Sequence, residues 1–158
     1  MSVRRFGTWA GALAALALLA AGCGRKTEAP SGATGGAMAT ATVSPYDAGP
    51  RAGEQPVNEA LVEQGEHLFQ TKGCSACHAF GKRLSCPDLN GVTMRRTALW
   101  MENQMLHPEV MTKQDPIAKQ LFGQYALQMP NLNLASSDAK AVIEYLKHKN
   151  RESAEKHE

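Results

Sequence analysis

Apolar side chains recur at helical spacing along residues 58–72, namely Leu61, Val62, Leu68 and Phe69, with Gly65 among them. Asn58 precedes this run and can accept a hydrogen bond from the first turn, as an N-cap residue does. Glycine inside a helix costs about 1 kcal/mol relative to alanine, so Gly65 indicates the close approach of a second element. We expect this helix to end at Gly73, directly before a cysteine.

Three further helices are predicted from the same 3.6-residue period. They are expected to begin near Thr97, at Asp115-Pro116, and at Ser136 or Ser137. Pro108 should close the first of them, and beyond Asn150 the chain is charged and expected to fray. The sequence shows no alternating strand of useful length. The pattern therefore predicts an all-α domain of about four helices.

Residues 1–22 resemble an export signal, because Arg4 and Arg5 precede an apolar stretch that is too short to cross a bilayer. The segment ends in Leu19-Ala20-Ala21-Gly22-Cys23, which is similar to the cleavage box of bacterial lipoproteins. This resemblance implies that Cys23 is lipidated, so that acyl chains anchor the protein to a membrane. An ordinary cleaved signal with a chance cysteine is the alternative.

Composition divides the rest of the chain. Residues 23–56 are rich in Gly, Ala, Ser, Thr and Pro and have no apolar period, so we expect a lipid-anchored flexible linker. The folded domain is predicted over residues 57–150, with a charged tail at 151–158. The chain holds 17 basic and 15 acidic residues. It lacks the clustered basic residues of a nucleic-acid binder, and no such partner is expected.

Cys74-Ser75-Ala76-Cys77-His78 matches C-x-x-C-H, the attachment signature of a c-type haem. Each thiol can bond to one of the two vinyl groups of the porphyrin, and the adjacent His78 can then ligate the iron. Two rival interpretations exist. Cys74, Cys77, His78 and Cys86 could bind zinc, or Cys74 and Cys77 could form a thioredoxin-like dithiol. Neither rival accounts for the export signal, and the dithiol lacks the strand context that it needs.

Residues 57–150 resemble a class I cytochrome c of the small bacterial monohaem type. The resemblance rests on Gly65-x-x-x-Phe69, the haem motif, Pro87-Asp88-Leu89, Met129-Pro130 and the closing Val142-Ile143-x-Tyr145-Leu146. It implies a fold in which the first and last helices cross at right angles around one covalently bound haem c. Glycine packs against an aromatic residue at that crossing, which would pair Gly65 with Tyr145.

The resemblance also implies roles for single residues. Met129 would be the second axial iron ligand, opposite His78, and the Pro87 carbonyl would accept a hydrogen bond from the His78 ring. Trp100 and Tyr125 would wall the haem pocket or bond a propionate. Either Arg95 or Arg96 could pair with a propionate carboxylate.

Some assignments stay open on the residues alone. The chain has seven methionines, and most methionines fill cores, as we expect of Met101 and Met105. Met94, Met111 and His107 remain alternative ligands to Met129. Cys86 departs from the family, which commonly has glycine before this proline. It could be a small buried side chain, a reactive thiol, or a partner in an intermolecular disulfide or metal site.

The expected function is single-electron transfer by a membrane-tethered carrier, not an enzyme, because two filled axial positions leave no open site for a small-molecule substrate. Partners would be redox proteins: a quinol-oxidising complex as donor, and a terminal oxidase or periplasmic reductase as acceptor. The haem domain would lie in the periplasm or on the outer face of the bacterial envelope. Lys72, Lys82 and Arg83 would be solvated surface or a positive rim for docking. The alternatives are a haem subunit fixed in a larger redox complex, and a haem sensor or peroxidase-like protein with a dissociable methionine.

Overall fold

The computed structural model describes residues 43–156. The predicted signal segment, Cys23 and the first part of the predicted linker lie outside these residues. Within them the chain forms one short 3-10 helix and seven α-helices, and it contains no strand. The all-α prediction is therefore confirmed for the described part of the chain.

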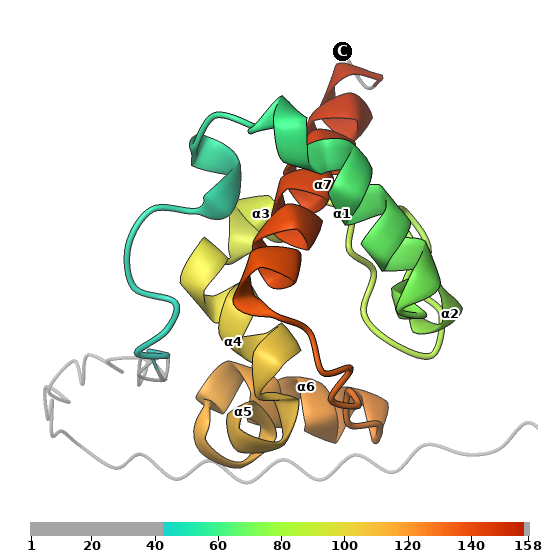
Figure 1. The fold of residues 1–158 in the computed structure, drawn as a ribbon. Coiled ribbons are helices and arrows are strands. Elements are labelled where there is room, and N and C mark those ends of the chain that lie inside the picture. The colour runs from blue at the N-terminus through green and yellow to red at the C-terminus, as the bar shows by residue number, and fades with distance from the viewer. Residues whose placement is uncertain (1–42, 157–158) are drawn as a thin grey trace, which may run out of the picture. The chain divides into compact units, whose positions relative to one another are not determined.

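Helix α1 (Glu59–Thr71) lies across helix α7 (Ser136–Glu155), and this crossing is the main contact between distant parts of the chain (Figure 1). Asn58 caps α1 as predicted, since its Oδ1 accepts the N–H of Ala60 at 3.2 Å. Gly65 is buried at the crossing, where the Ala141 backbone and the Tyr145 side chain pack against it. The predicted pairing of Gly65 with Tyr145 is thus present.

Five helices connect α1 to α7. They are α2 (Cys74–Cys77), α3 (Val92–Arg95), α4 (Ala98–Leu106), α5 (Pro108–Gln114) and α6 (Pro116–Tyr125). Two of them begin where the sequence predicted. Thr97 caps α4 by accepting the Trp100 N–H, and the Asp115 carboxylate caps α6 by accepting the N–H groups of Ile117 and Ala118.

Three details differ from the sequence prediction. Pro108 follows the end of α4, but it also opens α5, because proline is favoured in a first helical turn, where its missing N–H has no partner to lose. The short helix α3 has no amphipathic period and was not predicted. Helix α7 continues through Glu155 rather than fraying at Asn150, and Arg151 pairs with Glu59 of α1 at 2.6 Å.

Residues 43–57, which we call the N-terminal strap, belong to the folded unit. They contain the 3-10 helix η1 (Ala52–Glu54) and run beside α3 and α4 (Figure 1). Ser44 is 1% exposed and Ala52 is 2% exposed. The ordered chain therefore begins well before the predicted boundary at Val57, inside the stretch expected to be a flexible linker.

Of the helices between residues 43 and 156, none is both long enough and apolar enough to span a membrane.

We expect Gly65→Ala to destabilise the protein by about 1–3 kcal/mol, the usual cost of overpacking. A Cβ atom at this position would lie 2.7 Å from the Ala141 carbonyl carbon and 2.8 Å from the Tyr145 Cβ. This clash would outweigh the gain in helix propensity, which is about 1 kcal/mol. Guanidinium denaturation followed by circular dichroism would measure the loss.

Gly123→Ala in α6 is the matched control. It makes the same substitution in a helix, but nothing lies within 4 Å of the added Cβ. This variant should be as stable as the wild type or more so. Equal effects at the two positions would contradict the close approach of α1 and α7.

Candidate functional site

A cavity of about 360 Å³ lies between the helices, and its walls are mostly apolar. Side chains from all parts of the domain reach it: Phe69 of α1, Trp100, Met101 and Met105 of α4, Leu121 and Tyr125 of α6, and Val142 and Leu146 of α7. Cys74, His78, Pro87 and Met129 line the same cavity. The structure therefore brings most of the predicted site residues to one place.

The haem motif begins on the single-turn helix α2. Gly73 enters it with a left-handed backbone (φ 79°), which costs glycine little. A helical turn places residues three positions apart on the same side, so the thiols of Cys74 and Cys77 share a face. Both residues are half-buried, and Cys74 lines the cavity. Burial raises the pKa of the Cys74 thiol.

The His78 ring contacts the Pro87 carbonyl, the hydrogen-bond partner that the family resemblance implies. Its Nδ1 lies 2.8 Å from the Pro87 carbonyl oxygen, which can only accept a hydrogen bond. Burial lowers the pKa of His78, and the bond to Pro87 acts in the opposite direction. The ring is thus set as a neutral imidazole that donates from Nδ1, which leaves the Nε2 lone pair for a metal.

The loop that supplies Pro87 is bonded back onto the haem motif along its length. The Cys86 N–H donates to the Cys77 carbonyl at 3.2 Å, and the Leu89 N–H donates to the Ala79 carbonyl at 2.9 Å. The Asp88 carboxylate accepts the Gly81 N–H at 2.8 Å. These bonds enclose the His78–Pro87 pair on both sides, so the orientation of the ring does not rest on one contact.

Asn150 of α7 secures the far end of this loop, and sequence analysis missed it. Its Oδ1 accepts both the N–H and the hydroxyl of Thr93, and its Nδ2 donates to the Leu89 carbonyl at 3.1 Å. Asn150 is 8% exposed. A lone asparagine near a charged helix end gives no sequence signal, because the partners that bury it come from the distant 89–93 segment.

Met129 lies in the irregular segment between α6 and α7, as predicted, and is half-buried against the core. Two non-glycine residues with left-handed backbones flank it, Ala126 (φ 51°) and Asn133 (φ 50°). The Asn131 side chain ties the segment to the Leu106 carbonyl at 3.2 Å.

The alternative ligands lie elsewhere. Met111 is 1% exposed in the core, Met94 is 55% exposed, and His107 is an exposed residue between α4 and α5. None of the three lines the cavity. Met101 and Met105 are buried, as expected of core methionines.

Trp100 and Tyr125 both line the cavity, in agreement with the pocket role predicted for them. The indole N–H of Trp100 is already donated to the buried Asp115 carboxylate at 3.0 Å. Trp100 therefore acts as an apolar wall and not as a propionate donor. Tyr125 is half-buried, and the Arg83 guanidinium carbon lies 4.4 Å from the centre of its ring.

Cys86 is 7% exposed and also lines the cavity. Burial and the neighbouring Cys77 thiol both raise the pKa of Cys86. The zinc alternative fails, because no three His, Cys, Asp or Glu side chains within the described residues are placed to hold a metal ion. The thioredoxin-like alternative fails too, since residues 43–156 contain no strand.

The residues present fit a covalently bound haem. The Cys74 thiol lines the cavity and Cys77 lies on the same helical turn, the His78 imidazole is held beside them by Pro87, and the Met129 thioether lines the same apolar space. Cys74 and Cys77 would hold the macrocycle, and His78 and Met129 would hold the iron. An apolar wall suits the porphyrin face and lowers the access of water to the metal.

Known proteins agree with this site. The family model "Cytochrome c" matches residues 62–150. A cytochrome c from Rhodothermus marinus is 38% identical, with a TM-score of 0.59 over 63% of this chain and 84% of that one. An engineered form of the Rhodothermus protein is 36% identical, with a TM-score of 0.58 over 61% and 84% of the two chains. No curated protein sequence matches this chain.

The family match covers more than half of the chain and includes the whole haem motif, His78, Pro87 and Met129. The structural neighbours share the helical arrangement at well over a quarter sequence identity. The chain therefore belongs to the cytochrome c family, haem-based electron carriers with a covalently bound, iron-containing haem c.

Proposed function

We propose that this protein is a single-electron carrier tethered to a bacterial membrane, with His78 and Met129 as the axial ligands of its haem iron. The observation that carries the proposal is that an oriented imidazole and a thioether line one apolar cavity with Cys74, and that Cys77 lies on the same short helix α2 as Cys74. Haem c supplies the one-electron chemistry when bound. The chain supplies its ligands and its dry surroundings.

The pair of ligands favours electron transfer over catalysis. Two protein ligands leave no open position for a substrate, and they need little rearrangement when the iron changes charge. A thioether raises the reduction potential relative to a second imidazole. The bond from His78 to Pro87 holds the tautomer that ligates the metal.

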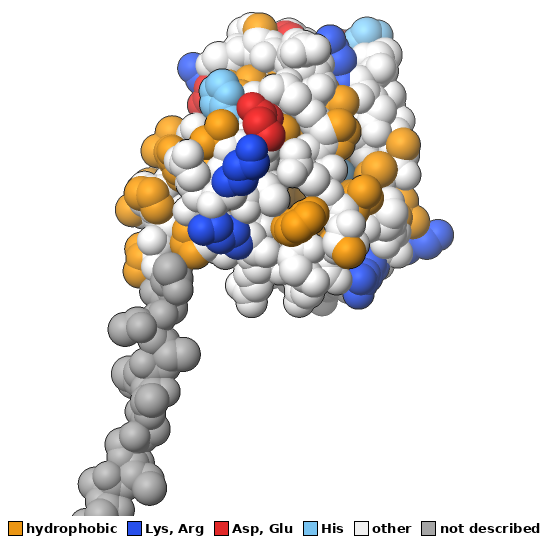
Figure 2. Space-filling model, turned by 90° about the horizontal axis from the view of Figure 1, so that it is seen from below, with side chains coloured by type: hydrophobic (Ala, Val, Ile, Leu, Met, Phe, Trp, Pro, Cys, Tyr) orange, Lys and Arg blue, Asp and Glu red, His pale blue; other side chains and the backbone are white. Residues whose placement is uncertain are grey.

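We further propose an acidic redox protein as the docking partner. Lys72, Lys82 and Arg83 are all exposed near the haem motif, and Arg83 stacks on Tyr125 at the cavity wall. Figure 2 shows the end that carries α5 and α6, where more basic than acidic side chains are visible and hydrophobic side chains lie between them. Such a surface steers an acidic partner into contact.

We propose the tether and its location from the sequence. Lipidation at Cys23 would hold the domain at the outer face of a bacterial membrane, within reach of membrane-bound partners. A quinol-oxidising complex is the donor that we propose, and a terminal oxidase or a periplasmic reductase is the acceptor.

We expect Met129→Ala to abolish the long-wavelength absorption band of ferric methionine ligation and to lower the reduction potential, because the thioether no longer favours ferrous iron. The spectrum and potential of the purified haem protein would measure this. Met94→Ala is the control, since Met94 is exposed and lies outside the cavity. A band that survived in Met129→Ala would assign the ligand to another residue.

Cys23→Ser should move the protein from the membrane fraction to the soluble fraction of cells, because the acyl attachment point is lost. Fractionation followed by detection of covalent haem would measure this. Thr27→Ala, a neutral change a few residues away, should leave the protein with the membrane. Membrane retention of a haem-loaded Cys23→Ser protein would argue against the anchor and not against electron transfer.

A further inference from the structure

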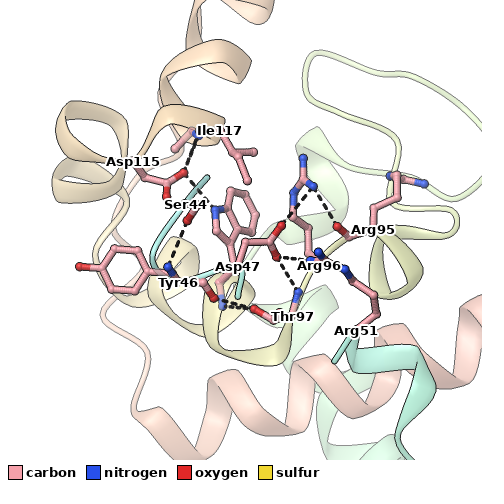
Figure 3. Close-up of polar contacts among 11 residues, drawn as sticks. Ser44, Tyr46, Asp47, Arg51, Arg95, Arg96, Thr97, Asp115 and Ile117 are labelled. Atoms are coloured by element: carbon pink, nitrogen blue, oxygen red, sulfur yellow. Dashed lines mark hydrogen bonds and ion pairs between the residues drawn. The ribbon is translucent and has the colours of Figure 1, made fainter. Parts of the chain in front are cut away.

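The N-terminal strap contacts cavity-lining Arg96 through the Ala52 N–H, which donates to the Arg96 carbonyl at 3.0 Å, and through one buried carboxylate. Asp47 is 9% exposed. Its Oδ1 accepts the Thr97 N–H at 2.8 Å and pairs with Arg51 at 2.6 Å, and its Oδ2 pairs with Arg96 at 3.5 Å (Figure 3). The neighbouring Tyr46 carbonyl accepts the Thr97 hydroxyl at 2.7 Å. The strap is thus joined to the junction between α3 and α4.

Arg96 stands between this carboxylate and the cavity. It lines the cavity, and its guanidinium carbon lies 5.2 Å from the centre of the Trp100 ring. Its Nη1 donates to the Arg95 carbonyl at 2.9 Å as well as to Asp47. Within residues 43–156 its Nε and Nη2 have no hydrogen-bond partner, which leaves two donors for a bidentate contact with a carboxylate.

The terminal nitrogens of Arg95 both donate to backbone carbonyls of the neighbouring loop. Its Nη1 donates to the Asn90 carbonyl at 2.7 Å and its Nη2 donates to the Asp88 carbonyl at 3.3 Å. Both terminal nitrogens therefore serve the loop that carries Pro87. Both arginines line the cavity, but of the two Arg96 is the one whose Nε and Nη2 both lack a hydrogen bond within residues 43–156, and this is a pair of nitrogens that can bind one carboxylate together.

We propose that Asp47 is a positioning residue for Arg96. The Asp47 carboxylate holds the Arg96 guanidinium at the cavity wall and partly neutralises its positive charge. It thereby sets how strongly Arg96 stabilises a haem propionate. It also sets how the reduction potential of the haem depends on pH. The inference rests on the proposed electron-carrier function. It gives the strap, which lies outside the stretch matched by the family model, an effect on the haem through Arg96.

The sign of the effect follows from the charges that face Arg96. They are Asp47 and Arg51 of the strap, Arg95 beside it, and Asp115 at the start of α6. Together with Arg96 itself they make three basic and two acidic groups, so the cluster carries one net positive charge. Burial lowers the pKa of Arg96, and the two carboxylates oppose that change.

When less of the Arg96 positive charge is neutralised by a carboxylate, that charge favours ferrous over ferric iron and favours an ionised propionate. Asp47→Asn should therefore raise the reduction potential, and it should move the pH-dependent fall in potential to lower pH. Asparagine still offers an oxygen to the Thr97 N–H. Arg96→Gln should do the reverse in both respects, because it removes the positive charge.

The experiment is a spectroelectrochemical titration of the full-length haem-loaded protein across the pH range in which carboxylic acids titrate. In the double variant Asp47→Asn/Arg96→Gln the guanidinium that Asp47 acts on is gone, so its curve should coincide with that of Arg96→Gln alone. Ser44→Ala is the matched control. It disturbs the strap at a side chain that is 1% exposed without changing charge, and it should leave the potential unchanged while lowering the melting temperature.

Two outcomes would overturn the inference: an Asp47→Asn curve that coincides with that of the wild type, or single variants that shift the potential in the same direction. Poor haem loading of Asp47→Asn would leave the comparison of Arg96→Gln with the double variant, whose curves must coincide if Asp47 acts through Arg96; a further shift in the double variant would also overturn the inference. A wild-type protein with no reversible one-electron couple would instead contradict the proposed function itself.

Discussion

The close approach of α1 and α7 at Gly65 is the contact on which the rest of the domain depends. It is possible only because position 65 has no side chain, since the Ala141 backbone and Tyr145 occupy that space. One turn further along α1, Phe69 packs against Phe80 and Tyr145, with ring centres 5.4–6.0 Å apart within the trio. Helix α2 follows two residues after α1 ends. The crossing therefore fixes where the haem motif lies relative to the α7 side chains that complete the cavity.

Two buried polar side chains then join distant backbone to the cavity wall. Asn150 of α7 binds Leu89 and Thr93, which secures the loop that orients His78. Asp47 of the strap binds the start of α4 beside Arg96. Removing either group would leave buried backbone donors or acceptors without partners, at about 1–3 kcal/mol each. The apolar core determines the shape of the cavity, and the hydrogen bonds of Asn150 and Asp47 fix the positions of the backbone segments around it.

The sequence predicted what depends on local pattern. The helical period, the helix starts at Asn58 and Asp115, the glycine at the crossing and the haem motif each carry a signal within a few residues, whereas Met129 was singled out by the family resemblance. The strap carried no such signal, because Asp47 is buried against a partner fifty positions away. Asn150 escaped for the same reason. Pro108 was predicted only to close a helix, but it also begins α5, because proline is favoured in the first turn of a helix.

The backbone of the segment that carries Met129 affects how fast that segment can open. Between α6 and α7 the backbone turns through two left-handed non-glycine residues, Ala126 and Asn133, and a single side-chain bond from Asn131 ties it to α4. Few bonds and strained turns give a segment that opens locally at a lower free energy than the core. The Met129 thioether would then leave and return at the rate at which this segment opens and closes. That rate would be far faster than unfolding of the α1–α7 crossing. Under the proposed ligation, the Met129 thioether would therefore be held by a segment that opens more easily than the α1–α7 crossing.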